Sequence, residues 1–583
     1  MGEKYYLTTP LRRGRRPYIT RNSVSLPKRI EPPLSHNIGS TFGVSDNIGP
    51  LHSPVSSNQD SQDGFQATKP SAGPQAFVAK ESFMSPLAPL HAHAVSESVD
   101  LMRDSFSKEL LQAVGATSLP PNSQIEAYGD SYFNHHYHRA PIIDRADLST
   151  DQPSLILTQA ICLIGSILRY SGIHSPVEES EPYYNKVKAL LYANHEPDQR
   201  NVLKALCILA LRNITPPKVV SLDCSWQWIG TATRLAQQMG FHREETYAQL
   251  PNPGNARRIM WFLFTEDKLV TACFGRPSLF GDFDFNIRPL RLEDFEIPDL
   301  QAELCIEYTN LNVILGRIVD RHSRKSDISQ EEVLISTPRA SQYSNTIQAT
   351  SFLQSLQDWI HNLPLKLQIY TGRSRNVFRR DIHEVHINYF VCLIVFFRLF
   401  GHAISPQTAS TASLVASSCI ARLYQEITHR DEINYLLPIN NWFLMVGCAP
   451  QICHNTACQG KDRLCGEELL ILTNSLRYMK LKWPPAGVLL DIVGRLCSVE
   501  AGVSDDIGDG QDWQTAESWS GQLSFDILEA LFPFPSELSP RMGLVKGGGD
   551  ELGDQEMLDR MVEAGNDDLD WIFNEFQLGF LDS

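Results

Sequence analysis

The sequence is poor in features that mark secreted and β-rich proteins. Its twelve cysteines lie between Cys162 and Cys497 without a repeated spacing, which is typical of a reducing compartment where thiols stay unpaired. The N-terminus lacks the apolar run of a secretory signal, so we expect no secretion. Alternating polar and apolar residues with tight glycine turns, the pattern of β-strands, are also scarce. We therefore expect a soluble, intracellular and mainly helical protein.

Signatures of catalysis are missing or incomplete. The sequence has neither a G-x-S-x-G turn nor a G-x4-G-K-[S/T] loop. In HEVH (383–386) the histidines are too close for the H-E-x-x-H zinc-protease helix, which places two imidazoles one turn apart. HRD (429–431) lacks the other kinase motifs, and the three histidines of FNHHYHR (133–139) point in different directions on a helix. We expect no enzyme, no cofactor and no catalytic residue.

Long hydrophobic runs are also few. The most apolar run, INYFVCLIVFFRLF (387–400), is short for a bilayer span and contains Asn388 and Arg398. A buried helix is the better interpretation, and we expect no membrane association.

Charge is unevenly distributed along the chain. Residues 1–30 carry eight Lys or Arg against Glu3, whereas residues 501–583 carry 19 Asp or Glu against three basic residues. Residues 1–500 as a whole hold 48 Lys or Arg and 48 Asp or Glu. A basic head and an acidic tail are typical of interaction segments at the two ends of a chain.

Composition divides the chain into four parts. Residues 1–30 form the basic segment, and residues 31–100 are rich in Ser, Pro, Asn and Gly, too polar to offset the entropy of folding. Residues 101–500 form the folded domain, and residues 501–583 form the acidic tail. The fold class we expect is all-α: a large multi-helix regulatory domain flanked by disordered N-terminal and acidic C-terminal segments.

Helical periodicity dominates the predicted domain. Apolar residues recur at helical intervals in 158–172, 200–213, 352–364 and 468–485, and the segments end at glycine or proline breakers. No repeat of fixed length is evident, so a regular solenoid is not expected.

Two stretches are more specific than the rest. SWQWIGTATRLAQQMGFHREE (225–245) predicts a helix with Gly240 at its C-terminal end, and ARRIMWFLFTEDKLVTACFGRPSLFGDFDFNIRP (256–289) predicts a long helix that begins with an arginine pair. An arginine pair next to acids indicates ion pairing that fixes helix packing. Gly-Arg-Pro indicates a helix end, because glycine permits positive φ and proline prevents continuation.

Together these stretches resemble the middle homology region of fungal zinc-cluster transcription factors, with weaker similarity in 131–148 and 386–400. The resemblance covers roughly residues 125–500. It implies an all-α regulatory domain of nuclear gene-control proteins, often devoted to one metabolic pathway. Departures from the family pattern are Met260 in place of Trp, Glu266 at a usually apolar position and Lys268 in place of Arg. The matching positions are Gly230, Ala232, Arg234, Ala236, Gly240, His242, Arg243, Arg257, Arg258, Trp261, Phe264, Asp267, Gly275, Arg276, Pro277 and Asp282.

The DNA reader of that family, a six-cysteine zinc cluster with two C-x2-C-x6-C halves, is not found in this sequence, which has no cysteine before Cys162. The head is then expected to be sequence that follows a cluster which was lost or omitted. Cys448, Cys453, His454, Cys458 and Cys465 form the one cysteine-dense stretch, but no C-x2-C pair exists, so we expect buried thiols and no metal.

The basic head contains LRRGRRPYITR (11–21). Charge density alone suffices for nuclear import or loose phosphate contact, which is the preferred interpretation. An AT-hook would need Arg-Gly-Arg-Pro, and here one arginine is in excess. A solvated basic tail is the remaining alternative. The residues expected to contact DNA or an import receptor are Arg12, Arg13, Arg15, Arg16, Arg21, Lys28 and Arg29.

The C-terminus, DDLDWIFNEFQLGFLDS, interleaves acids with large apolar residues. Acids keep such residues solvated until they dock in the apolar groove of a partner, so an activation tail is predicted; the alternative is a helix packed on its own domain. The residues expected to make the contact are Leu569, Trp571, Ile572, Phe573, Phe576 and Leu578.

These observations predict a transcription regulator of the nucleus that controls one metabolic or secondary-metabolite pathway and recruits transcription machinery or co-activators through its tail. DNA binding is expected to be weak and nonspecific without a zinc cluster. The first alternative is a co-regulator that pairs with, or sequesters, a zinc-cluster transcription factor, or that forms a homodimer. A third possibility is an all-α ligand-binding protein or enzyme.

Overall fold

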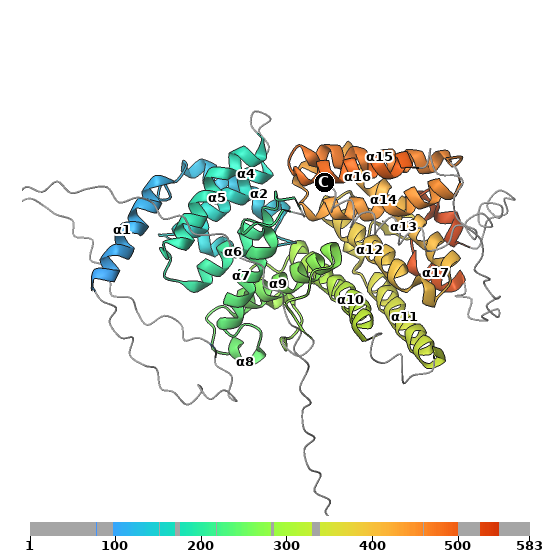
Figure 1. The fold of residues 1–583 in the computed structure, drawn as a ribbon, viewed down its shortest axis with the longest axis horizontal. Helices are drawn as coiled ribbons and strands as arrows, with labels where there is room; N and C mark the ends of the chain where they lie inside the picture. The colour runs from blue at the N-terminus through green and yellow to red at the C-terminus, as the bar shows by residue number, and fades with distance from the viewer. Residues whose placement is uncertain are drawn as a thin grey trace, which may run out of the picture. The chain divides into compact units, whose positions relative to one another are not determined.

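The computed structural model describes Phe77 and residues 97–150, 152–169, 175–216, 219–281, 285–328, 338–458, 460–499 and 525–546. All of them lie in one compact unit, Lys69–Ser583. Within these residues the fold is all-α, as expected, and the one sheet is a two-stranded hairpin. Figure 1 shows the helices in chain order.

The first part of the described chain is built around a buried helix, α4. Its apolar residues are buried on nearly every side, because α2, α5 and α6 all pack on it. Helix α5 starts at a capping box in which Ser175 and Glu178 satisfy each other's backbone amides. The elements are α1 (Glu97–Ala113), α2 (Asn122–His135), α3 (Arg145–Leu148), α4 (Leu155–Leu168), α5 (Pro176–Tyr192), α6 (Gln199–Leu211), α7 (Ser225–Gln238), α8 (Glu244–Tyr247), α9 (Pro253–Phe274) and η1 (Leu292–Asp294).

The second part is built around α12, which packs against α10, α13 and α14. The two short strands pair antiparallel around Gly372, whose φ of 62° suits a tight turn. The elements are α10 (Leu300–Ile328), α11 (Pro338–His361), η3 (Leu365–Leu367), β1 (Tyr370–Thr371), β2 (Ser374–Arg375), α12 (Arg380–Phe400), η4 (Gly401–Ala403), α13 (Pro406–His429), η5 (Glu432–Tyr435), α14 (Ile439–Ala457), α15 (Arg463–Lys480) and α16 (Pro485–Val499).

Helix α12 contains the apolar run 387–400. It is 21 residues long, so length alone does not distinguish it from a membrane span, contrary to the sequence argument. Burial does distinguish the two, because 89% of the most apolar stretch of α12 is buried inside the protein. The prediction of a buried helix therefore agrees with the structure for a different reason.

The boundary predicted at residue 500 needs correction. Residues 525–546 form α17 (Phe525–Leu531), η6 (Ser536–Leu538) and η7 (Met542–Val545), which pack on α11 and α13. The hydroxyl of Tyr389 donates to the carbonyl of Leu531 at 2.8 Å, and Phe532 stacks on Phe390. These apolar residues belong to the same hydrophobic core as α12. The local excess of acidic residues concealed a segment that is part of the domain.

Arg541 fixes this returning segment to α15. Its guanidinium pairs with Asp462 at 2.6 Å and with the buried Glu468 at 3.3 Å. Glu468 also accepts a hydrogen bond from Gln451 at 2.8 Å. A buried carboxylate needs such partners, so the segment around Arg541 completes the interior of the domain.

Candidate functional site

The arginine pair predicted from the sequence lies in the first turns of α9, and both side chains are buried. Arg257 bridges two acids from different segments. It pairs with Asp294 of η1 at 2.8 Å and with Glu244 of α8 at 2.6 Å. The ring of Tyr247 lies 4.3 Å below the guanidinium. Arg257 thus joins three segments of the chain through one side chain.

Arg258 makes a different set of contacts. Its Nε donates to the carbonyl of Pro141 at 3.0 Å, and its terminal nitrogens reach the carboxylate of Asp144 and the carbonyl of Asp294. Every donor of a buried guanidinium must find an acceptor, and here the backbone supplies two of them. Arg258 therefore ties the loop after α2 to the start of α9.

Asp144 is the centre of the loop that receives Arg258. It accepts hydrogen bonds from the hydroxyl of Tyr137 at 2.9 Å and from the amide of Asn255 at 3.0 Å. Asn255 also donates to the carbonyl of Ile142 at 2.9 Å. Asp144 is buried, and both its oxygens have protein partners.

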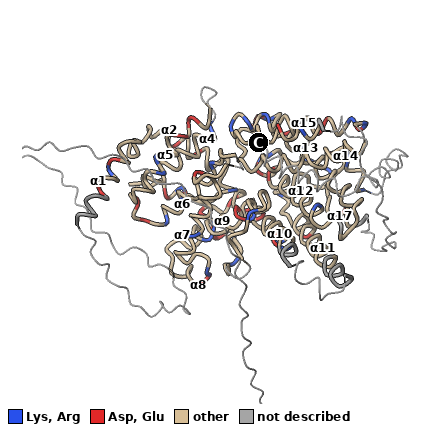
Figure 2. Tube along the Cα trace, viewed as in Figure 1, with Lys and Arg blue, Asp and Glu red and all other residues tan. Residues whose placement is uncertain are grey.

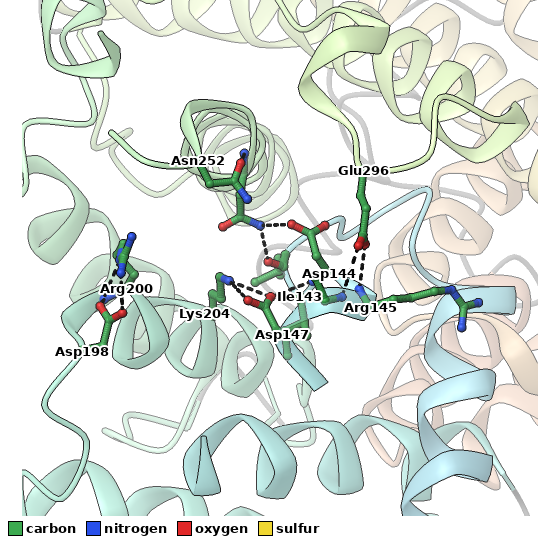
Figure 3. Close-up of polar contacts among 12 residues, drawn as sticks. Ile143, Asp144, Arg145, Asp147, Asp198, Arg200, Lys204, Asn252 and Glu296 are labelled. Atoms are coloured by element: carbon green, nitrogen blue, oxygen red, sulfur yellow. Dashed lines mark hydrogen bonds and ion pairs between the residues drawn. The ribbon is translucent and has the colours of Figure 1, made fainter. Parts of the chain in front are cut away.

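The short helix α3 follows this loop, and an acid and a lysine from two other segments hold it (Figure 3). Glu296 accepts from the backbone amides of Arg145 and Ala146 at 2.9 and 3.2 Å. Asp147 accepts from the backbone amide of Asp144 at 2.8 Å and pairs with Lys204 of α6 at 2.7 Å. Figure 3 shows Lys204 directed at Asp147 and Glu296 directed at the start of α3.

We call these residues the arginine-pair junction: Asp144, Asp147, Lys204, Glu244, Asn255, Arg257, Arg258, Asp294 and Glu296. Five of them line a surface cavity of about 280 Å³: Asp144, Asp147, Arg258, Asp294 and Glu296. Gly254 forms part of its wall, because a Cβ there would lie only 2.5 Å from the carbonyl oxygen of Asp294. The junction's carboxylates are engaged with guanidinium, ammonium and amide groups. The geometry is that of a structural clamp, with no paired acid and base poised for catalysis.

The comparisons with known proteins agree with this interpretation. Residues 130–363 match the model of the fungal specific transcription factor domain. This region is similar to that family over about two fifths of the chain. The whole arginine-pair junction lies inside the fungal transcription factor domain. The match ends at residue 363, so the weaker similarity noted for 386–400 lies beyond it.

Several curated relatives of the domain are transcription regulators by name. Cutinase transcription factor 1 alpha of Fusarium vanettenii is 26% identical over 366 residues, which are 57% of this chain and 38% of the relative. The acetamidase regulatory protein of Aspergillus fumigatus is 23% identical over 345 residues, 55% of this chain and 42% of the relative. Transcription factor cpaR of Aspergillus oryzae is 25% identical over 205 residues, 32% of this chain and 33% of the relative. The chain spans about two fifths of the first two relatives. The matching family and these relatives are regulators of transcription by name, and none of the three is named as an enzyme.

The other motif residues inside the fungal transcription factor domain also serve its architecture. Gly275 ends α9 with φ of 63°, as the sequence predicted, and Arg276 lies over the ring of Trp226. The indole of Trp261 donates to the carbonyl of Arg288 at 2.9 Å. Asp267 accepts a hydrogen bond of 2.6 Å from the hydroxyl of Ser278, the residue that follows Pro277.

Helix α7 carries the remaining motif positions. Gly240, just after the helix, has φ of 77°, and a Cβ there would lie 2.9 Å from the hydroxyl oxygen of Thr246. The backbone of Phe77 donates to the carbonyl of Gln238 at 2.7 Å, next to this glycine. Gly230 is buried, whereas Arg234 is exposed and has no structural role comparable with that of the arginine pair.

The three departures from the family pattern are accommodated differently. Met260 is buried in the core, and Lys268 pairs with Asp320 at 2.7 Å. Glu266 is half-buried, and burial raises the pKa of its carboxyl group while the charge of Arg139 opposes that shift.

The cysteine-dense stretch holds no grouping suited to a metal within the described residues. Cys448, Cys458 and Cys465 are buried, and the thiol of Cys465 lies 2.9 Å from the carbonyl of Gln451. His454 pairs with Asp462 at 3.0 Å.

The histidines singled out in the sequence are interior residues. His136 and His138 are buried, and burial lowers the pKa of His138 to about 3. His383 pairs with Glu426 at 2.9 Å, and a ring nitrogen of His386 lies 2.9 Å from the carbonyl of Ile382.

Sequence reasoning missed one buried centre. Arg139 pairs with Glu384 of α12 at 3.2 Å, and Arg380 reaches the same carboxylate. The guanidinium of Arg139 lies 4.2 Å from the centre of the Tyr308 ring. Arg139 and Glu384 are 245 residues apart, so no local pattern could indicate their contact.

The two terminal sets of candidate residues lie outside the described residues. They are the basic residues Arg12, Arg13, Arg15, Arg16, Arg21, Lys28 and Arg29 and the tail residues Leu569, Trp571, Ile572, Phe573, Phe576 and Leu578. Asp282 of the family motif is outside them as well.

Proposed function

We propose that the protein is a transcription regulator of the nucleus that controls one metabolic or secondary-metabolite pathway. The observation that carries this proposal is the match of residues 130–363 to the fungal specific transcription factor domain. Two of the motif residues inside this match, Arg257 and Arg258, make the central ion pairs of the arginine-pair junction.

The region proposed to recruit transcription machinery or co-activators is residues 547–583. It is shorter than the tail predicted from the sequence, because residues 525–546 pack in the core. Residues 547–583 contain eleven Asp or Glu against Arg560, together with the apolar residues from Leu569 to Leu581. Acidic segments with interspersed large apolar residues are suited to docking in apolar grooves of partners.

A fusion experiment tests the recruiting segment. Residues 547–583 joined to a heterologous DNA-binding domain should activate a reporter, and replacing Trp571 and Phe573 by alanine should reduce that activation. An expressed fusion without reporter activity would contradict the proposal for the tail.

The second candidate function is a co-regulator that pairs with a zinc-cluster transcription factor or forms a homodimer. It applies to residues 1–583 as they stand, which hold no cysteine before Cys162, since the family reads DNA with cysteine-bound zinc. Mobility shifts with duplexes of different sequence separate the two functions. Equal binding to all duplexes, lost steeply as salt rises, means phosphate contacts alone and favours the co-regulator.

A further inference from the structure

Helices α15 and α16 pack against each other at the edge of the domain (Figure 1). Residues of both helices line a groove of about 470 Å³. Its apolar lining is Leu469, Leu470, Leu490 and Val493, and Leu470 is 55% exposed. Thr473, Arg477 and Asp491 add polar groups to the lining. A Cβ added at Gly466 or Gly494, which also line the groove, would meet no atom within 4 Å, so there is space beside both glycines.

Basic residues outnumber acids on the exposed sides of the two helices, and Figure 2 marks Lys and Arg in blue along α15. Arg463, Arg477, Lys480 and Arg495 are exposed, against the acids Glu467 and Asp491. Arg477 and Asp491 line the groove itself. An acidic amphipathic helix would therefore match the apolar part of the lining and the excess of basic residues on the two helices.

The chain itself contains such a sequence. In residues 566–583, five apolar residues recur at the intervals i, i+3, i+4, i+7 and i+11, which place them on one side of a helix: Leu569, Ile572, Phe573, Phe576 and Phe580. The same residues include five acids and no Lys or Arg. Trp571 and Leu578 fall on the opposite side of that helix.

The connection is long enough. Arg541 is bound to Asp462, the residue before the first turn of α15, and the described chain ends at Lys546. The segment from 547 to 565 can span up to about 60 Å when extended. Helix α15 has 18 residues and is about 27 Å long. The whole groove is within reach of residues 566–583.

We propose that residues 566–583 dock as an amphipathic helix in the groove between α15 and α16 of the same chain. Docking buries the apolar side of the segment and places its acids near the basic residues of the two helices. The regulatory consequence rests on the proposed function: the docked segment is withheld from transcription machinery and becomes available when a partner or ligand opens the groove.

Cys497 provides a direct readout, because it lines the groove and is exposed, whereas the other eleven cysteines are buried or half-buried. The experiment measures how fast the full-length native protein reacts with a maleimide at Cys497, located by peptide mapping. A segment that binds with a dissociation constant of about 0.1 mM and is held by its linker at about 1 mM is docked about nine-tenths of the time, so the reaction slows about tenfold. The double variant Ile572→Asp with Phe576→Asp, which leaves the described core intact, should therefore react about tenfold faster than the wild type.

Two matched controls test the geometry. Leu578→Asp adds the same kind of charge on the opposite side of the predicted helix and should leave the rate within about twofold of the wild type. On the groove, Leu470→Glu should raise the rate in the wild-type chain, whereas Leu365→Glu, at a 66% exposed leucine outside the groove, should not. An unchanged rate in the Ile572→Asp, Phe576→Asp variant, or an equal increase in Leu578→Asp, overturns the proposal.

Dilution identifies the occupant. If the segment of the same chain covers Cys497, the slow maleimide reaction is independent of protein concentration. If a second copy covers it, the reaction becomes faster on dilution, and that result overturns intramolecular docking. The reporter fusion of residues 547–583 lacks the groove and gives a separate result. If the fusion activates the reporter but the maleimide reaction of Cys497 is not slowed, the docking proposal is wrong and the recruiting function stands. If the reaction is slowed but the fusion does not activate the reporter, the recruiting function is wrong and the docking proposal stands.

Discussion

At the scale of single residues, the fungal transcription factor domain depends on buried charges whose partners come from distant segments. Arg258 is the clearest example, since it is among the largest side chains that are completely buried. Its partners come from the loop at Asp144 and from η1, segments far apart in the sequence. Removing one member of a buried pair leaves the other charge without compensation.

We expect Arg258→Met to lower the free energy of unfolding by about 3–5 kcal/mol, because the Asp144 carboxylate stays buried after its cation is lost. Urea denaturation of the purified protein measures the change. Arg234→Ala is the matched control, since Arg234 belongs to the same family motif but is exposed, and it should change stability by less than about 0.5 kcal/mol. Similar effects of both variants would show that the junction is not a clamp.

Histidines in the interior give the domain a predicted dependence on pH. Burial lowers the pKa of His386 to about 4, below its ordinary value of 6.5. Between these values the unfolded chain binds the proton and the folded chain does not. The stabilising contribution is therefore present above about pH 6.5 and is lost as the pH falls toward 4, with a slope of about 1.4 kcal/mol per pH unit for each such group.

We expect His386→Gln to reduce this dependence. The variant should be less stable than the wild type at pH 7, and the difference should shrink by about 1–2 kcal/mol between pH 7 and pH 5. Urea denaturation at three pH values checks it, with His429→Gln, at an exposed histidine, as the comparison. A constant difference between wild type and His386→Gln across the range would refute the assignment.

At the scale of helices, glycines decide how closely two elements approach. Gly165 of α4 faces Tyr128 of α2, and a Cβ at Gly165 would overlap the backbone and side chain of that tyrosine. Gly466 of α15 is also helical, but a Cβ there would meet nothing within 4 Å. The same substitution should therefore have opposite effects at the two positions.

We expect Gly165→Ala to destabilise the protein by about 1–3 kcal/mol, because α2 and α4 must move apart. Gly466→Ala should stabilise it by about 0.5–1 kcal/mol, since alanine is the better helix former and has room. Chemical denaturation of the two variants beside the wild type provides the test. A stabilising Gly165→Ala would mean that the α2–α4 contact is looser than described.

The sequence predicted these helices well where apolar residues repeat at helical spacing. The segment 200–213 becomes α6, Gln199–Leu211, and the helix predicted at 225 becomes α7, Ser225–Gln238. The arginine pair lies in the first turns of α9 and Gly275 follows its last residue, where helix starts and ends have local signals in the sequence. Asp144 could not be assigned to Arg258, nor Glu384 to Arg139, since those two contacts join residues more than 100 positions apart.

At the scale of the whole chain, composition was misleading in one place. Residues 525–546 lie within an acidic region, yet Leu531, Phe532, Phe534, Met542 and Val545 are buried. Net charge is an average over a segment, whereas burial depends on which residues meet the core. The interior of the domain is therefore completed by residues 525–546, which are separated in the sequence from α16 by residues 500–524.

Two truncations test this conclusion. A chain that ends at residue 546 should lose no more than about 1.4 kcal/mol, the contribution of a tail docked about nine-tenths of the time, because every described contact is retained. A chain that ends at 524 should lose more than about 5 kcal/mol, since it exposes the core beside Tyr389 and Phe390 and removes Arg541 from the buried Glu468. Such a loss is comparable with the total stability of a typical domain, so this chain should melt at a much lower temperature or fail to fold.

Arg541→Ala in the full-length protein provides a second test if the shorter chain is insoluble. It should lower the free energy of unfolding by about 3 kcal/mol in urea denaturation. Equal melting of the two truncated chains, together with a neutral Arg541→Ala, would return residues 525–546 to the tail.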